Sequence, residues 1–426
     1  MQSVTHAPRS SWKVIGLASL GGALELYDFI IYGVFAMQIA TQFFPSIDPV
    51  AALLSTFGVF AIGYISRPLG GVILSSFGDR YGRRVVFIVS IMGMSLCTLG
   101  IGLVPTYETI GIWAPVILIL LRLAQGFFLA GELPCSITYV VEEIPHRASF
   151  VSGLVIFCLN LGVLVATLVN LALHQLFDAR EMTAFGWRIA FILGGCLGIF
   201  SYWVRRTLAE SHEFQTIKSE TIRQPFRHVI KNHGPSVITG ICLAAIANAS
   251  NTMLFVVLPS YMTNVLKLDP HAVSVGQNLG VAIMSVSLLF VAWLGDRIPP
   301  HRLHRIGCLL ILFGSYPLYS ALVTHVITPL QMFLALGVIG GFVNGTYAYL
   351  LATSFPTQVR FSGIALSLNL TTVIFTGSTP LVITSLIAAT GSSIAPAGFI
   401  MTVAVISVAA GFVFHRNRTT SMAVSA

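Results

Sequence analysis

The chain has 426 residues, of which 55% are hydrophobic and only 9% are charged, with a formal net charge of +8. Soluble domains carry about 25% charged residues, so this composition excludes an ordinary water-soluble globule. A helix that spans a bilayer needs about 20 mostly apolar residues, and segments of that kind recur along nearly the whole sequence. The sequence therefore predicts an all-α, polytopic integral membrane protein.

About twelve apolar segments are predicted to span the membrane, which leaves little of the chain for an extramembrane domain. In chain order they are residues 14–41, 51–77, 85–104, 112–140, 149–174, 187–206, 235–264, 271–295, 305–326, 328–353, 360–389 and 393–415. The first segment contains Glu25 and Asp28 and is followed by no small-residue cleavage pattern. We therefore expect it to be retained as a spanning helix, unlike a signal peptide.

The basic residues follow this topology. With the N-terminus placed in the cytoplasm, 18 of the 23 Lys and Arg residues fall on the inner side, three outside (Arg180, Arg188 and Lys267) and two within the membrane (Arg67 and Arg122). This is a strong positive-inside bias, so both termini are predicted to be cytoplasmic. The positive charge then reflects orientation and contact with anionic lipid, and no nucleic-acid partner is expected.

The cysteines give no sign of metal or redox chemistry. All six lie within the apolar segments and none forms a C-x-x-C pair: Cys97, Cys135, Cys158, Cys196, Cys242 and Cys308. They are expected to be small buried hydrophobic residues. No nucleotide loop or nucleophile motif occurs either. We therefore expect no cofactor and no enzyme activity, with a membrane-embedded hydrolase as the open alternative.

A central hydrophilic stretch divides the apolar segments into six and six. It predicts an N-terminal six-helix bundle at residues 1–204, a cytoplasmic linker at residues 205–233 and a C-terminal six-helix bundle at residues 234–426. The triplet Gly-Asp-Arg occurs once in each half, and its aspartates, Asp79 and Asp296, are 217 residues apart. An internal duplication explains this spacing, and pseudo-symmetric repeats of this kind build alternating-access transporters.

The loop after the second segment resembles the cytoplasmic signature of the major facilitator superfamily, with Ser75 where that family usually has glycine. Its residues are Gly78, Asp79, Arg80, Gly82, Arg83 and Arg84. Further strings resemble the metabolite:proton symporter family, the relatives of proline/betaine, shikimate, citrate and 2-oxoglutarate carriers. These strings are residues 25–29, 32–33, 67–71, 122–126, 131–132, 186–188 and 355–363.

This resemblance implies the major facilitator fold, a bacterial inner membrane location and proton-coupled symport of a small organic acid or zwitterion by alternating access. Leu26, in place of a usual aromatic residue, and Thr353, in place of an expected Glu, bear on substrate preference. The second loop copy is degraded by Pro299 and Pro300. That loop is therefore expected to contribute less to conformational gating.

Five charged side chains lie inside the predicted spans: Glu25, Asp28, Arg67, Arg122 and Glu132. A charge at mid-membrane costs about 2.5–3.5 kcal/mol on insertion scales, so each is a functional candidate. With three carboxylates and two arginines, one carboxylate lacks a cationic partner, and desolvation favours its neutral form. Glu25 or Asp28 is predicted to carry a proton, assisted by Arg122 and Glu132. The alternative is a set of static ion pairs that fixes helix packing.

Helical spacing places Glu25, Asp28 and Tyr32 on one face and Arg122, Gln125 and Glu132 on another. Buried arginines favour a substrate that bears a carboxylate. The predicted substrate contacts are Tyr32, Arg67, Gln125, Asn251 and Phe255. For the asparagines of the C-terminal half, interhelical packing is an equal alternative.

Residues 78–84 are predicted to act as a conformational latch, with simple positive-inside anchoring as the alternative. An exporter of the same superfamily, working by antiport, is a rival function. Such exporters usually have a Gly-Pro-rich fifth helix, whereas residues 153–170 contain no proline, so symport is favoured. A solute sensor is a further rival, but no signalling domain is visible. We expect a monomer whose partners are a small solute, protons and membrane lipid.

Overall fold

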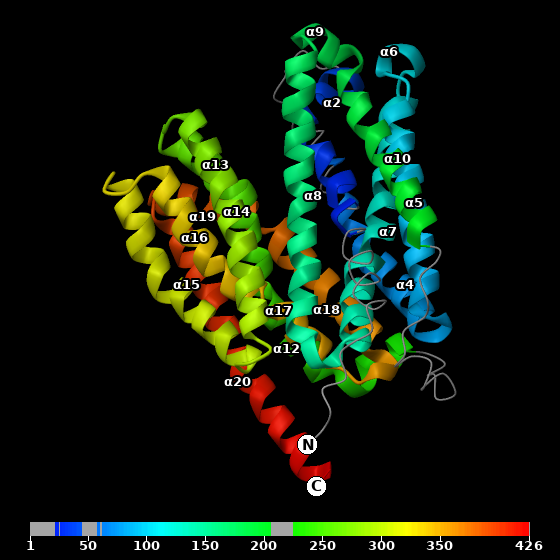
Figure 1. Ribbon diagram of the computed structural model, residues 1–426. Coiled ribbons are helices and arrows are strands. Elements are labelled where there is room, and N and C mark those ends of the chain that lie inside the picture. The colour runs from blue at the N-terminus through cyan, green and yellow to red at the C-terminus, as the bar shows by residue number, and fades with distance from the viewer. Residues whose placement is uncertain (1–21, 25, 45–57, 60–61, 206–224, 426) are drawn as a thin grey trace. The chain divides into compact units, whose positions relative to one another are not determined.

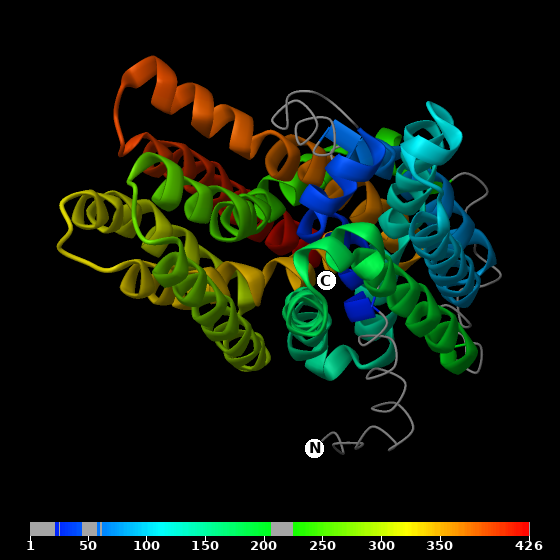
Figure 2. The same ribbon diagram turned by 90° about the horizontal axis from the view of Figure 1, so that it is seen from above.

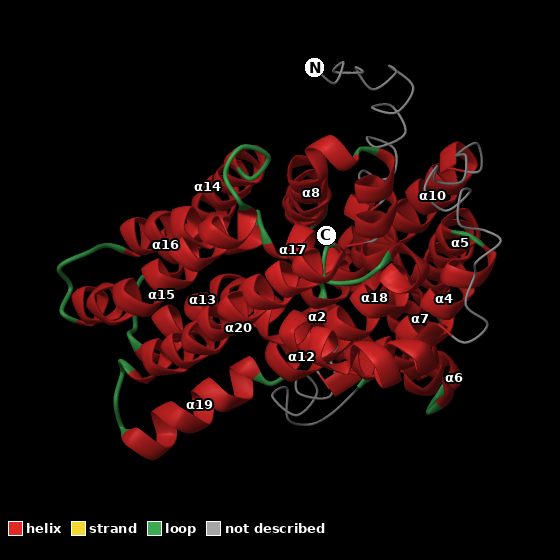
Figure 3. Ribbon diagram, turned by 90° about the horizontal axis from the view of Figure 1, so that it is seen from below, coloured by secondary structure: helices red, strands yellow, loops and turns green. Residues whose placement is uncertain are grey.

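The computed structural model describes residues 22–24, 26–44, 58–59, 62–205 and 225–425. Helices make up the secondary structure of this described part, which contains no strand (Figure 3). Ten of its helices are long and apolar enough to cross a membrane. The first two predicted spans lie partly outside the described residues, and their described parts are largely helical.

The described helices form two compact units. The first unit comprises residues 1–143 and 158–225, and the second comprises residues 144–157 and 226–426. The predicted bundle limits at residues 204 and 234 remain a prediction. The short segment at residues 144–157, from the first half of the sequence, is grouped with the second unit.

Helices α4, α5, α7 and α10 pack together in the first unit (Figure 1). They extend over Arg67–Tyr81 (α4), Arg83–Leu103 (α5), Trp113–Glu143 (α7) and Trp187–Arg205 (α10). Helix α5 packs against both α7 and α10, and α4 packs against α7. The other described elements are the helical residues 22–24 and 26–34, α2 (Ala36–Phe43), α6 (Tyr107–Ile110), α9 (Ala179–Glu181), the π-helical η2 (Met182–Gly186) and most of α8 (Ala148–Leu176).

Two glycines fix the path of α4. Gly82 separates α4 from α5 with a φ of 111°, a conformation that side chains other than glycine rarely adopt. A Cβ atom on Gly70 would lie 2.1 Å from the carbonyl oxygen of Phe127 in α7. The backbones of α4 and α7 therefore touch, as is common where small residues line helix contacts in membranes.

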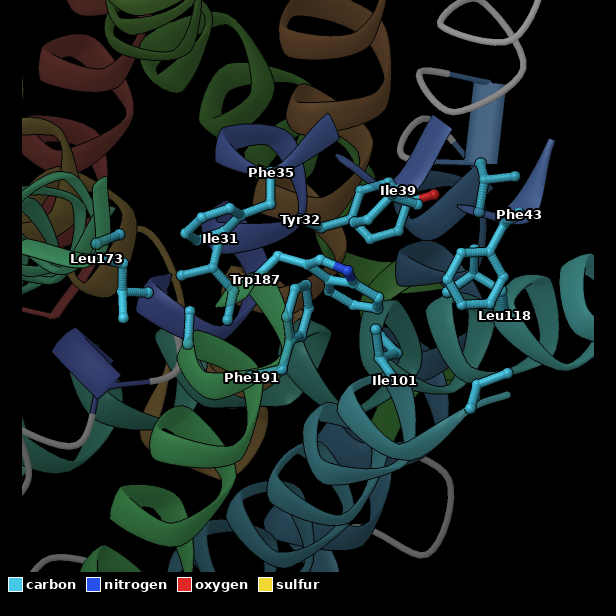
Figure 4. Close-up of a cluster of buried hydrophobic side chains, with 14 of the residues drawn as sticks. Ile31, Tyr32, Phe35, Ile39, Phe43, Ile101, Leu118, Leu173, Trp187 and Phe191 are labelled. Atoms are coloured by element: carbon cyan, nitrogen blue, oxygen red, sulfur yellow. The ribbon is translucent and has the colours of Figure 1, made fainter. Parts of the chain in front are cut away.

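An apolar cluster holds the first helix against α7, α8 and α10. Figure 4 shows Phe43, Trp187 and Phe191 in this cluster, and all three side chains are fully buried. The neighbouring Arg188 donates from Nη1 to the carbonyl oxygens of Gly102 and Val104, at 2.8 and 2.7 Å. These carbonyls lie at the end of α5, where a basic side chain satisfies free acceptors. The Trp187-Arg188 pair thus fastens α10 to α5.

The second unit contains the helices of the C-terminal half of the chain and the start of α8. They are α12 (Pro225–Thr252), α14 (Pro270–Leu294), α15 (Pro300–Val323), α16 (Pro329–Asn344), α18 (Arg360–Thr371), α19 (Thr379–Thr390) and α20 (Ala395–Ser425), with the short α13 (Leu258–Ser260), α17 (Tyr347–Ala352), and the 3-10 turns η1 (Pro145–Arg147) and η6 (Thr357–Val359). Helix α16 contacts both α14 and α15, and α15 also packs on α20 (Figure 2).

Three π-helical segments interrupt the helices of this unit: η4 (Met253–Val257), η5 (Tyr261–Val265) and η7 (Thr372–Gly377). Prolines accompany them, since Pro259 lies between η4 and η5, and Pro380 follows η7. Such segments often mark functional sites. Helix α12 also kinks at His233, two residues before Pro235, so residues 225–232 of the predicted linker are helical.

Candidate functional site

Asp28 lies on the first helix and is 1% exposed. The side chain of Thr98, in α5, lies beside its carboxyl group. A Cβ atom on Gly194 of α10 would lie 2.3 Å from Oδ1 of Asp28, so this glycine leaves room for the acid. Among the described residues, Oδ1 itself has no hydrogen-bond partner. Glu25, the other candidate proton carrier, lies outside the described residues.

Arg122, on α7, is fully buried beside the first helix. Its guanidinium carbon lies 4.2 Å from the ring centre of Phe29 and 4.4 Å from that of Tyr32, which are cation–π distances. The Nη1 atom donates to Oε1 of Gln125 at 2.8 Å and to the Phe29 carbonyl oxygen at 3.4 Å. The structure thus brings the predicted residues Tyr32, Arg122 and Gln125 together.

Thr98 connects these two groups. The Nε2 atom of Gln125 donates to Oγ1 of Thr98 at 2.9 Å, and Thr98 also faces Asp28. The described contacts therefore run from Asp28 through Thr98 and Gln125 to Arg122, and all four side chains are at most 1% exposed. Sequence reasoning missed Thr98, because a threonine in an apolar helix carries no distinguishing pattern.

The other two predicted charges of the first unit lie elsewhere. Glu132 is buried on α7, ten residues after Arg122, which corresponds to about 15 Å along the helix axis. Arg67 is half-buried at the start of α4, with its guanidinium carbon 5.8 Å from the ring centre of Tyr64. Tyr64 in turn meets the ring of Phe29 edge-on at 5.1 Å. Arg67 is therefore connected to the Arg122 group through aromatic rings.

The second unit gathers amide side chains around α12. The Nδ2 atom of Asn251 donates to Oδ1 of Asn344 in α16 at 3.1 Å. One turn earlier, Oδ1 of Asn248 accepts hydrogen bonds from Thr372 and Thr376 of η7, at 3.4 and 3.2 Å. Sequence reasoning missed the two threonines. The amides that it singled out are thus joined to α16 and η7, as the packing alternative expects.

Asn251 nevertheless keeps one free acceptor. Its Oδ1 atom is buried and has no hydrogen-bond partner among the described residues. Phe255, one turn further on in η4, is half-buried, and its carbonyl oxygen accepts from Nε2 of Gln277 at 3.0 Å. Asn251 therefore has the capacity to accept a hydrogen bond from a solute, because its amide oxygen is otherwise unused.

The predicted latch loop has a buried and an exposed side. Gly78 and Asp79 are buried at the end of α4, whereas Arg80 and Arg84 are exposed. The guanidinium carbon of Arg80 lies 5.1 Å from the ring centre of Tyr81. Gly82 forms the turn described above, and the Arg83 side chain lies outside the described part of the structure. An acid held inward among outward-pointing arginines is a suitable arrangement for a latch.

The second loop copy makes a defined contact despite its prolines. Oδ1 of Asp296 accepts from the backbone amides of Ser149 and Phe150 at 3.1 and 3.2 Å, at the start of α8. A helix start offers free amide donors and a positive dipole end. Burial raises the pKa of Asp296, while the two amides and the nearby Arg147 and His146 act against this rise. Pro299 and Pro300 follow this contact without removing it.

No metal centre is visible in the described part of the chain, where no three His, Cys, Asp or Glu residues are grouped to hold an ion. The described part of the chain combines ten apolar helices, a buried acid near a group of hydrogen-bonded side chains that includes a buried arginine, and interrupted helices beside amide side chains. They are the features of a secondary transporter of the membrane.

Comparison with known proteins agrees with this class. The profile of the Major Facilitator Superfamily matches residues 18–374. The glycine betaine/proline/ectoine/pipecolic acid transporter OusA of Dickeya dadantii is 31% identical over 420 residues, covering 94% of this chain and 82% of its own. The proline/betaine transporter of Salmonella typhimurium is 30% identical over 417 residues, with coverages of 94% and 82%.

Among solved structures, the proton:xylose symporter XylE superposes with a TM-score of 0.77 at 17% identity, over 96% of both chains. The chain belongs to the major facilitator superfamily. The family resemblance and the all-α membrane fold predicted from the sequence are thereby confirmed.

Proposed function

We propose that this chain is a proton-coupled symporter of proline, glycine betaine or a similar small zwitterion, and that Asp28 carries the proton. The observation that carries the proposal is the buried group of polar side chains formed by Asp28, Thr98, Gln125 and Arg122, in which hydrogen bonds join Thr98, Gln125 and Arg122. In this group of side chains, Asp28 is the residue that binds the proton, and Arg122 provides a fixed positive charge. Burial without water penalises an ionised carboxylate unless a partner compensates.

Proton coupling follows from this arrangement if the surroundings of Asp28 change during transport. When the site is closed, the acid is stable in its neutral form, because it is 1% exposed and one oxygen has no hydrogen-bond partner among the described residues. When the site opens to water, ionisation costs less and the proton leaves. Arg122 then balances the negative charge.

The proposed substrate class rests on the relatives and on polar groups of the chain. Both relatives described above are named as transporters of proline and betaine. The free Oδ1 of Asn251 suits the ammonium hydrogens of proline, and the half-buried ring of Phe255 suits a quaternary ammonium group through cation–π attraction. Within the first unit by itself, a buried arginine such as Arg122 favours a ligand that bears a carboxylate.

The test is uptake of radiolabelled proline, glycine betaine, citrate, 2-oxoglutarate and shikimate into proteoliposomes, with and without an inward proton gradient. We expect accumulation of proline or glycine betaine only with the gradient. Accumulation of a dicarboxylate instead would reject the substrate class. Efflux driven by the gradient would indicate an antiporter, and binding without uptake a sensor.

The role of Asp28 is tested separately. Asp28→Asn should abolish accumulation against a gradient, because the amide cannot release a proton, while exchange of labelled for unlabelled substrate continues. Asp269→Asn removes the same charge at the exposed start of α14 and is the control. Glu25→Gln is measured alongside. If Asp28→Asn and Glu25→Gln both accumulate substrate like the wild type, the proposed proton role is wrong.

The proposal includes location and gating. The transporter is placed in the bacterial inner membrane with both termini in the cytoplasm, as a monomer without enzyme activity. Supporting this orientation, the basic residues lie mainly in loops assigned to the inner side. The loop from Gly78 to Arg84 is proposed to act as a latch, supported by the buried side chain of Asp79.

A further inference from the structure

The second unit contains a cavity between its helices. Residues of α12, η4, α14, α15, α16 and α20 line it, and it offers about 30 Å³ to the centres of water molecules. Most of the described lining residues are apolar, such as Met253, Met284 and Ile311, and none of them is charged. Since one water molecule needs about 10–15 Å³ of such space, the cavity has room for about two.

Two hydroxyl groups of the lining residues have no hydrogen-bond partner among the described residues. They belong to Tyr319 of α15, which is 1% exposed, and to Ser250 of α12. Serines in helices commonly donate to the carbonyl group one turn earlier, as Ser315 does to Ile311 at 2.6 Å, but Ser250 does not. Because a buried hydroxyl group without a partner is costly, both groups favour a ligand that forms hydrogen bonds.

The polar side chains nearest to this cavity already have other partners. The ring centre of Tyr261 lies 6.2 Å from that of Tyr319, but the hydroxyl group of Tyr261 donates to the carbonyl oxygen of Ser393. The Nδ2 atom of Asn344 donates to the carbonyl oxygen of Gly340, a lining residue, at 3.0 Å. Neither side chain therefore satisfies the hydroxyl group of Tyr319.

We propose that this cavity is a binding site for ordered water, held by the hydroxyl groups of Tyr319 and Ser250. The oxygen of Ser315, one turn before Tyr319 on α15, keeps a lone pair that accepts a further hydrogen bond. A buried water molecule uses two to four polar partners, which these groups and a second water molecule supply. The water then bridges α12 and α15.

This inference goes beyond the proposed function, because the site takes part neither in proton coupling nor in the proposed substrate contacts. The chemistry of the lining disfavours other occupants. An ion or a zwitterion would find no charged partner among the described lining residues, so its desolvation would not be compensated. An apolar molecule would leave both hydroxyl groups unpaired, whereas cavities that stay dry are apolar.

Hydroxyl-radical footprinting by X-ray radiolysis of the purified protein tests for water in the cavity, since the radicals form from water at the place that holds it. Met284 lines the cavity and is 1% exposed, whereas Met332, on α16, is fully buried and is not one of the lining residues. We expect Met284 to be oxidised several-fold more than Met332. Equal protection of the two methionines would overturn the proposal.

Two variants test whether the water is held at this site. Tyr319→Phe combined with Ser250→Ala removes both hydroxyl groups and should lower the oxidation of Met284 to that of Met332. Gly340→Ala fills part of the cavity without strain, because its Cβ atom would lie 3.4 Å from Sδ of Met284, and should also lower the oxidation.

Unchanged oxidation of Met284 in both variants would show that the radicals come from another place, and would overturn the proposal. If the double variant does not yield folded protein, Gly340→Ala decides alone.

Thermal stability separates a hydrated cavity from a dry one by the sign of a change. Tyr319→Phe removes a hydroxyl group that bonds to water in the hydrated site, so the melting temperature should fall by about 2 °C. Tyr27→Phe is the matched control and should show a similar fall, because the hydroxyl group of Tyr27 donates to the Ala190 carbonyl oxygen at 2.9 Å. A higher melting temperature in Tyr319→Phe would show an unsatisfied hydroxyl group in a dry cavity, and would overturn the proposal.

Discussion

Gly194 and Asp28 share one small space between α10 and the first helix. A Cβ atom at Gly194 would come within 2.3 Å of Oδ1 of Asp28 and 2.8 Å of Cε1 of Tyr27. Glycine inside a helix is about 1 kcal/mol less favourable than alanine. Glycine at position 194 therefore leaves the space that the carboxyl group of Asp28 occupies.

This closeness makes Gly194→Ala informative. The added methyl group must displace the Asp28 carboxyl, so we expect proton-driven uptake to fall at least tenfold. Gly314→Ala is the matched control in α15, because its Cβ would meet only Cδ1 of Ile339, at 3.8 Å. The control should transport normally and be as stable as the wild type or about 1 kcal/mol more stable to unfolding. Normal uptake in Gly194→Ala would show that α10 does not position the acid.

The residues of the site were predictable to different degrees. Charged side chains in apolar segments are costly, and this singled out Asp28 and Arg122, both of which the structure buries. Thr98 could not be found in this way. Buried threonines commonly bond to the carbonyl four residues earlier, as Thr98 does with Met94, so only the tertiary contacts with Gln125 and Asp28 distinguish it.

At the scale of elements, helix positions were more predictable than helix faces. Segment ends agree with the structure within a few residues for most spans, because hydropathy marks where a helix meets water. Helix faces are harder to predict where a π-helical segment occurs, because such a segment changes the helical register. The π-helical η4 begins at Met253, between Asn251 and Phe255.

The contact between Asp296 and the start of α8 should depend on pH. Burial raises the pKa of Asp296 above its ordinary value. The folded protein therefore holds the proton of Asp296 more tightly than the unfolded chain does. The resulting contribution to the free energy of unfolding is fully present below the ordinary pKa of aspartate, and it is lost as the pH rises through the higher pKa of the folded protein. An asparagine at this position cannot ionise and keeps an acceptor oxygen. Asp296→Asn should thus gain thermal stability relative to the wild type as the pH rises from about 4 to 7.

Differential scanning fluorimetry of the purified proteins measures this difference. Asp296→Ala, which removes the acceptor for Ser149 and Phe150, should be less stable than Asp296→Asn throughout the range. Asp269→Asn makes the same charge change at the exposed start of α14 and serves as the control. A stability difference between the wild type and Asp296→Asn that does not vary with pH would contradict the assigned direction.

At the scale of the whole molecule, composition was sufficient to predict the class of protein. The low charged fraction and repeated apolar segments predicted a polytopic membrane protein, and the two copies of Gly-Asp-Arg predicted a duplication. The grouping of residues 144–157 with the second unit was not predicted. It depends on contacts between residues about 140 positions apart, such as Ser149 with Asp296, which local patterns do not encode.

The proposed orientation is open to a direct test. A fluorescent protein fused after residue 426 should fluoresce, and alkaline phosphatase at the same point should be inactive, because the basic loops hold both termini in the cytoplasm. Alkaline phosphatase fused after Thr106, between the third and fourth predicted spans, should be active. The reverse pattern at either position would contradict the assigned topology.

The start of α8 packs in the second unit, and this affects the order in which the segments of that unit come together during synthesis. A Cβ atom on Gly153 would lie 2.2 Å from Cβ of Ala292, so this part of α8 fits directly against α14. A ribosome delivers Gly153 to the membrane long before Ala292 and Asp296. The nascent second unit therefore closes on a piece that is already inserted. If the two halves of the sequence were made as separate polypeptides, the second unit would be incomplete until residues 144–157 of the first polypeptide bind to it.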